Sequence, residues 1–187
     1  DPLDGTKEFV HRTGDFTVNV ALIEGNTPIW GAIYAPALQM LYWGGKGFGA
    51  FKQKGQAQPE SIQVQIPFQQ PVRAVRSRRH GHEKEHQQAK TEASPLNSLI
   101  FQSIGSSLKF CLVAEGQADI YARIGPTSEW DTAAGQAILE AAGGIMVDLQ
   151  GQTVRYNIRE SVVQPAFIAL GDKALLPEAL QHFDVNK

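Results

Sequence analysis

The joins between apolar segments near the start of the chain are too short for parallel strands. Strand-like segments at 16–23, 29–34, 41–43 and 49–52 are separated by turns rich in glycine and proline. A two-residue turn can join antiparallel strands, whereas parallel strands need a crossover of a dozen or more residues. The sequence therefore predicts an antiparallel meander over this region.

Further along, strand-like and helical segments alternate. After strands at 62–66 and 72–75 and a solvated helix within 80–92, the expected elements are a strand at 99–104, a helix at 106–115, a strand at 118–123, a helix at 131–142, a strand at 165–170 and a helix at 175–183. This pattern predicts an α/β fold. We expect a lobe at 1–76 with the antiparallel sheet and an α/β substrate-binding lobe at 77–187.

Composition excludes several classes of protein. The 187 residues are 42% hydrophobic with a formal net charge of −2, which gives no general basis for binding a nucleic acid polymer. Cys111 is the only cysteine, so the chain has no internal disulfide and no multi-cysteine metal site. With no transmembrane segment visible, the sequence predicts a cytoplasmic protein and leaves peripheral association with the inner membrane open.

Two short acidic motifs carry the chemistry. Asp1 and Asp4 lie in a turn made rigid by Pro2, and Asp131 opens a helix rich in small residues. Clustered carboxylates suit magnesium, and a two-metal phosphatase uses them to hold ions about 3.5 to 4 Å apart. Taken singly, each motif favours a structural role: a surface Asx-turn for the first and a helix-capping carboxylate for the second.

Together the motifs resemble the two signatures of the inositol monophosphatase family. Asp-Pro-Leu-Asp-Gly-Thr at 1–6 and Trp-Asp-Thr-Ala-Ala-Gly at 130–135 match in order and separation. The blocks at 5–9, 14–19, 33–36 and 105–110 are similar to the bacterial bisphosphate nucleotidase branch, and Gly-Ser-Ser-Leu-Lys-Phe at 105–110 favours that branch over inositol phosphatases. The resemblance implies the layered α-β sandwich of the inositol monophosphatase and sugar phosphatase type.

The resemblance also implies a set of metal and phosphate ligands. Asp1 would bridge two Mg²⁺ ions, the carbonyl of Leu3 would ligate the first ion, and Asp4 with Asp131 would hold the second; a third ion is also compatible with the family. Amides of Gly5 and Thr6 would bind the scissile phosphate, and the Thr6 hydroxyl would orient the attacking water. In the family a further glutamate precedes this loop, so we expect the chain to lack an N-terminal layer that carries it.

Substrate selection is expected from the second lobe. By resemblance, His80, Ser106, Lys109 and Arg123 would line a nucleotide pocket, and Lys109 and Arg123 would bind the phosphate that is not cleaved. Each of His80, Lys109 and Arg123 could instead be an ordinary solvated side chain.

The implied activity is magnesium-dependent hydrolysis of adenosine 3',5'-bisphosphate to AMP and phosphate by an activated water, with sensitivity to lithium. The 2',5' isomer and the 3'-phosphorylated sulfate donor are other candidate substrates. Two alternatives remain open at this point: an inositol or sugar monophosphatase on the same fold, and a catalytically incomplete fragment that only binds metal and phosphate.

Overall fold

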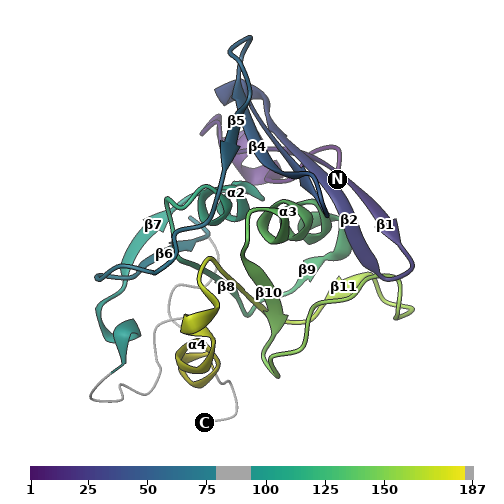
Figure 1. Cartoon of the computed structure of the whole chain (residues 1–187). Coiled ribbons are helices and arrows are strands. Elements are labelled where there is room, and N and C mark those ends of the chain that lie inside the picture. Colours follow the sequence, from purple (N-terminus) through teal and green to yellow (C-terminus); the bar gives the residue numbers. More distant parts are fainter. Residues whose placement is uncertain (79–93, 184–187) are drawn as a thin grey trace.

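Two β-sheets enclose a layer of helices, and a further helix covers the outer face of the second sheet (Figure 1). The computed structural model describes residues 1–78 and 94–183. This layered arrangement confirms the α/β class predicted from the alternation of strands and helices. No helix in the described residues has the length and apolar character needed to cross a bilayer.

The first sheet is the predicted antiparallel meander. Its strands, in both spatial and chain order, are β1 (Val18–Glu24), β2 (Thr27–Ala35), β3 (Met40–Gly45), β4 (Gly49–Lys54) and β5 (Glu60–Ile62). Along β1, Asn19, Ala21 and Ile23 are more buried than Val20 and Leu22, which are each 56% exposed. This alternation of the strand directs one face of the sheet toward the helices.

The second sheet mixes parallel and antiparallel pairs. Its spatial order is β10 (Ile145–Asp148), β12 (Phe167–Leu170), β8 (Ile120–Arg123), β6 (Arg73–Arg76) and β7 (Ile100–Ser103). The β6 strand is parallel to both of its neighbours, whereas β12 is antiparallel to both β8 and β10. A two-stranded sheet pairs β9 (Thr127–Ser128) with β11 (Val163–Gln164).

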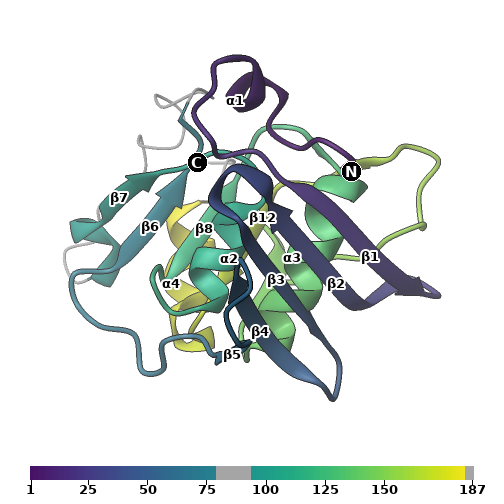
Figure 2. The same cartoon turned by 90° about the horizontal axis from the view of Figure 1, so that it is seen from above.

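Helices α2 (Leu108–Ala114) and α3 (Glu129–Ala141) fill the layer between the sheets. The other helices are α1 (Thr6–Val10), α4 (Leu176–His182) and the 3₁₀ turns Pro36–Leu38, Pro95–Ser98 and Lys173–Leu175. Figure 2 shows the first sheet covering α2 and α3.

Small residues allow α3 to approach its neighbours closely. A Cβ atom added at Gly31 of β2 would lie 2.5 Å from the Ala134 carbonyl oxygen, and one at Gly135 would lie 2.3 Å from the Phe110 ring of α2. The small residues of the helix that Asp131 opens therefore allow this close backbone packing. Because α3 is held this tightly from both sides, its first turn has a fixed position.

Some predicted elements differ from the structure. The strand expected at 62–66 ends at Ile62, because the Val64 amide donates to the Ala142 carbonyl oxygen at the end of α3 instead of joining the sheet. The predicted helix at 106–115 begins only at Leu108. The solvated helix expected within 80–92 lies outside the described residues, and the division into lobes at 76/77 stays a prediction.

Candidate metal and phosphate site

The acidic loop at the start of the chain is held against the residues that lead into β1. Asp4 and Thr17 exchange two backbone hydrogen bonds of 2.9 Å, and the Asn19 amide donates to the Asp1 carbonyl oxygen at 2.8 Å. Within the loop, the Leu3 amide donates to Asp1 Oδ1 at 2.7 Å. These bonds fix where the Asp1 and Asp4 carboxylates emerge.

Asp131 reaches the same place from the first turn of α3. Its Oδ2 accepts hydrogen bonds from the Ser128 amide at 2.8 Å and from the Thr127 hydroxyl at 2.9 Å. The amide bond satisfies a helix N-terminal donor, and the helix dipole favours a negative charge at this position. Both interactions orient the carboxylate through one oxygen and leave the other available.

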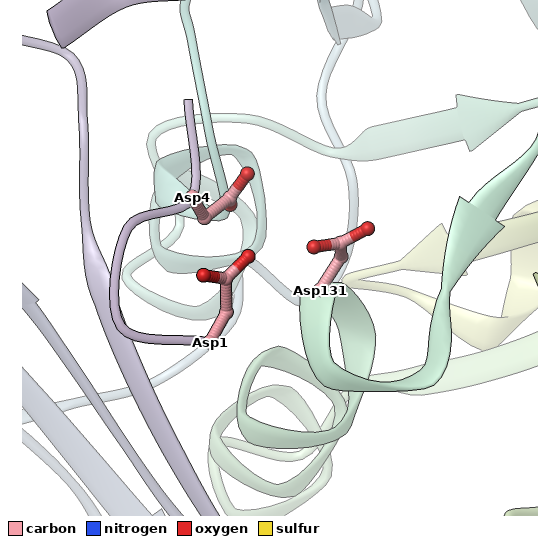
Figure 3. Close-up of side chains that lie close together, drawn as sticks. All are labelled: Asp1, Asp4 and Asp131. Atoms are coloured by element: carbon pink, nitrogen blue, oxygen red, sulfur yellow. The ribbon is translucent and has the colours of Figure 1, made fainter. Parts of the chain in front are cut away.

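The three carboxylates converge. Asp1, Asp4 and Asp131 each offer an oxygen within 4.8 Å of the others, from half-buried side chains (Figure 3). One oxygen of each accepts a hydrogen bond from the protein, and the second has no hydrogen-bond partner in residues 1–78 and 94–183. Three anionic groups this close repel one another, and a hard divalent cation with oxygen ligands would relieve that repulsion. The donor set therefore fits magnesium.

The Asx-turn and helix-cap interpretations from the sequence are also present in this geometry. Asp1 closes the turn through Oδ1 and Asp131 caps α3 through Oδ2, yet both belong to the carboxylate cluster. Each carboxylate has a second oxygen without a hydrogen-bond partner in the described residues, so the structural and metal-binding roles do not exclude each other.

A cavity of about 240 Å³ lies beside the cluster. It is lined by most of the residues expected from the sequence to bind metal or substrate: Asp4, Gly5, Thr6, Ser106, Lys109, Arg123 and Asp131. Asp1 adjoins it through the carboxylate cluster. Leu3 contributes a carbonyl oxygen 3.4 Å from the Thr6 hydroxyl, and His80 lies outside the described residues.

Three cationic side chains lie among the lining residues, Lys7, Lys109 and Arg123, and the last two were expected from the sequence. Lys109 is only 4% exposed, its Nζ donates to the Ser106 carbonyl oxygen at 2.5 Å, and it lies over the Tyr121 ring. Burial lowers the pKa of Lys109 to about 8, against the opposing effect of the Asp4 carboxylate. Arg123 is half-buried and donates to the Ser77 hydroxyl and the Pro126 carbonyl oxygen. Lys109 is therefore not the solvated side chain that its residue type alone would suggest.

Several polar residues of the site were missed by the sequence reasoning. Ser107, Asn19 and Thr127 form hydrogen bonds in or next to the carboxylate cluster. Asp15 accepts from Arg78 Nε at 2.6 Å and from the Gly105 amide at 3.1 Å, which ties the cavity wall to the residues before β1. Ser107 lies inside the 105–110 block and Asp15 and Asn19 lie inside the 14–19 block, so these three carried a usable signal, whereas Thr127 lies outside every family-like block.

Comparisons with known proteins agree with this geometry. The model of the "Inositol monophosphatase family" matches residues 1–184. A "3'(2'),5'-bisphosphate nucleotidase CysQ" from Salmonella typhimurium is 48% identical over 169 residues, which cover 89% of this chain and 65% of that protein. The protein of the same name from Escherichia coli K12 is 47% identical over 167 residues, with the same coverage. The chain thus spans a little under two thirds of the length of these relatives.

Solved structures show the same fold. CysQ from Bacteroides thetaiotaomicron, described as a bacterial member of the inositol monophosphatase family, superposes with a TM-score of 0.76 at 37% identity, covering 91% of this chain and 68% of that one. An inositol monophosphatase from Zymomonas mobilis superposes with a TM-score of 0.77 at 26% identity, covering 99% and 69%. The expected layered sandwich is confirmed, and the chain belongs to the inositol monophosphatase family.

Proposed function

We propose that this chain carries the site of a magnesium-dependent 3'(2'),5'-bisphosphate nucleotidase, which converts adenosine 3',5'-bisphosphate to AMP and phosphate. The observation that carries the proposal is a single cavity lined by Asp4 and Asp131 of the carboxylate cluster and by the cations Lys109 and Arg123. A bisphosphate needs both features, since one phosphate is cleaved and the other must be held. The names of the relatives at 47–48% identity supply the nucleotide class.

The carboxylates would hold the metal. In this assignment Asp1 would be a ligand shared by two magnesium ions, the Leu3 carbonyl oxygen would be a ligand of the first, and Asp4 with Asp131 would hold the second. Bound magnesium would neutralise phosphate charge and make a water more acidic, so that it attacks phosphorus more readily. The protein groups that orient these carboxylates are already hydrogen-bonded, as the 2.7 Å bond from the Leu3 amide to Asp1 shows.

The scissile phosphate would lie at the start of α1. Gly5 and Thr6 line the cavity there, where backbone N–H groups have no intrahelical acceptor. Gly5 has a φ of 82°, a left-handed conformation that favours glycine, and a Cβ at this position would lie 3.2 Å from Ser106 Cβ. The Thr6 hydroxyl would orient the attacking water. Attack would form a bond between the water oxygen and phosphorus and break the bond between phosphorus and the ribose oxygen, and the proton given up by the water balances the one that the leaving ribose oxygen takes up.

The second phosphate would bind Lys109 and Arg123, with Ser106 beside them. A lysine buried against an aromatic ring gains an anionic partner without further loss of its own hydration, because it is already desolvated. Arg123 can add a two-pronged contact to phosphate oxygens. His80 stays a predicted member of this pocket.

The proposal also locates the protein in the cytoplasm. Its support is Cys111, a free and fully buried thiol that suits a reducing compartment.

Phosphate release from adenosine 3',5'-bisphosphate and from inositol 1-phosphate, each with and without magnesium, tests the proposal. We expect magnesium-dependent preference for the nucleotide, loss of turnover in Asp131→Asn, and a raised KM in Lys109→Met for the nucleotide only. Preference for inositol phosphate, with turnover indifferent to Lys109→Met, would instead indicate an inositol or sugar phosphatase.

A parallel binding measurement distinguishes the enzyme from a catalytically incomplete fragment that only binds metal and phosphate. Manganese and nucleotide binding by calorimetry without turnover of either substrate would show a chain that binds metal and phosphate but does not catalyse. Turnover that is lost on Asp131→Asn would exclude it.

A further inference from the structure

A buried hydroxyl lies between the two acidic motifs. Ser107 is 3% exposed and immediately precedes α2. Its Oγ lies 2.6 Å from Asp4 Oδ2 and 2.8 Å from the carbonyl oxygen of Asp131. The residue therefore contacts both the N-terminal loop, 103 positions away in the chain, and the first turn of α3.

The single proton of this hydroxyl goes to Asp4. Hydrogen bonds from a hydroxyl to a carboxylate are typically about 2.5 to 2.7 Å long and are stronger than bonds to neutral acceptors. The Asp4 contact has that length and that charge, whereas the Asp131 carbonyl is neutral and more distant. One oxygen of Asp4 is thereby occupied, and Oδ1 has no hydrogen-bond partner in the described part of the chain.

Asn19 fixes the orientation of the hydroxyl. Its Nδ2 donates to Ser107 Oγ at 2.9 Å, in a buried bond. The Ser107 oxygen accepts a hydrogen bond from the Asn19 side-chain amide. The proton of the Ser107 hydroxyl therefore points elsewhere, and Ser107 donates it to Asp4. The backbone of Asn19 also holds the N-terminal loop, because its N–H donates to the Asp1 carbonyl oxygen.

We propose that Ser107 is a positioning residue that turns the Asp4 carboxylate so that Oδ1 faces the site shared with Asp1 and Asp131, and that Asn19 keeps Ser107 in the donating orientation. The proposal rests on the metal site proposed above. Residues that orient metal ligands typically change metal affinity about 10- to 100-fold when they are removed. Both residues would act on the metal through the Asp4 carboxylate.

Manganese binding to the whole chain, measured by calorimetry without substrate, tests this role. We expect Ser107→Ala to weaken binding about 10-fold and Ser107→Thr, which keeps the hydroxyl, to restore most of it. Asn19→Ala should weaken binding less than Ser107→Ala. The double variant should bind like Ser107→Ala alone, because Asn19 acts through the hydroxyl.

Cys111→Ala is the matched control. Cys111 is buried in α2, and its thiol lies 3.8 Å from the Ser107 carbonyl oxygen; within the described residues it has no hydrogen bond to Asp1, Asp4 or Asp131. The Cys111→Ala variant should lower the melting temperature of the metal-free protein but leave the manganese affinity unchanged. If Ser107→Ala fails to fold, Ser107→Cys keeps the volume and removes most of the donor strength.

The outcomes separate the two proposals. Manganese affinity equal to that of the parent in both Ser107→Ala and Ser107→Cys would overturn the positioning role and leave the metal site intact. Additive losses in the double variant would overturn the assignment of Asn19. A parent protein that binds no manganese would overturn the metal site itself.

Discussion

Replacing Gly31 with alanine tests how tightly α3 is held against the first sheet. The new Cβ would lie 2.5 Å from the Ala134 carbonyl oxygen and 2.7 Å from its Cα, whereas ordinary contact begins at 3.4 Å. Because both neighbours are helix backbone, no side chain can rotate away, and α3 must move by about 0.9 Å. Overpacking in a core typically costs about 1–3 kcal/mol, and a rigid backbone obstacle gives the upper end of that range or more.

The assay is urea unfolding of Gly31→Ala followed by circular dichroism, with Gly171→Ala as the matched control. Gly171 is also buried, but a Cβ there would meet nothing closer than 3.5 Å, so the control should change the free energy of unfolding by less than about 1 kcal/mol. Since α3 carries Asp131, we also expect weaker manganese binding by Gly31→Ala. Equal stability of the two variants would refute the reasoning.

Three further predictions concern buried polar groups. In metal-free protein, burial lowers the pKa of Lys109 from 10.5 to about 8, so between these pH values the unfolded state binds more protons than the folded state. The free energy of unfolding should therefore rise with pH across this window. Lys109→Met should abolish the rise and increase the free energy of unfolding at pH 7, measured by urea titration. Arg73→Leu should lower the free energy of unfolding by about 3–5 kcal/mol, because Asp119, 1% exposed, would lose its bidentate partner. The control is Arg155→Leu at an exposed site, and an equally large decrease in its free energy of unfolding would contradict the prediction. Tyr156→Phe should cost about 1–2 kcal/mol, since its buried hydroxyl bonds Thr132 and Gln136, but should leave manganese binding unchanged.

Sequence reasoning located strands of both sheets, but only in the first sheet does chain order also give the pairing of the strands. In the meander, each turn directly determines which strands pair, and the predicted segments at 16–23 and 41–43 lie on β1 and β3. The segment at 62–66 has the same alternation, but its amide at Val64 bonds the end of α3, which no local pattern shows. The short strand β10 was missed although Ile145, Met146 and Val147 follow a glycine pair that ends the preceding helix.

Among the residues of the site, too, some were predicted from the sequence and others were not. Asp1, Asp4 and Asp131 lie in recognisable motifs, and the structure brings them together as their chemistry requires. Ser107 and Asn19 act through partners 103 and 88 positions away, so their roles depend on the register of β1 and the start of α2. Burial of Lys109 likewise follows from packing against Tyr121, which a charged residue in a sequence does not reveal.

The position of β12 has a consequence for how the protein is made. Residues 167–170 lie between β10 and β8, so the edge strand β10 is separated from the other three strands of the second sheet until one of the last strands in the chain is synthesised. During translation, Ile168 and Leu170 must close this gap after every other strand of the sheet has left the ribosome. The carboxylate of Asp131 sits on the helix that packs against this sheet. Completion of the second sheet is therefore a late event in folding, whereas α3, which carries Asp131, also packs against the first sheet, whose strands are synthesised before it.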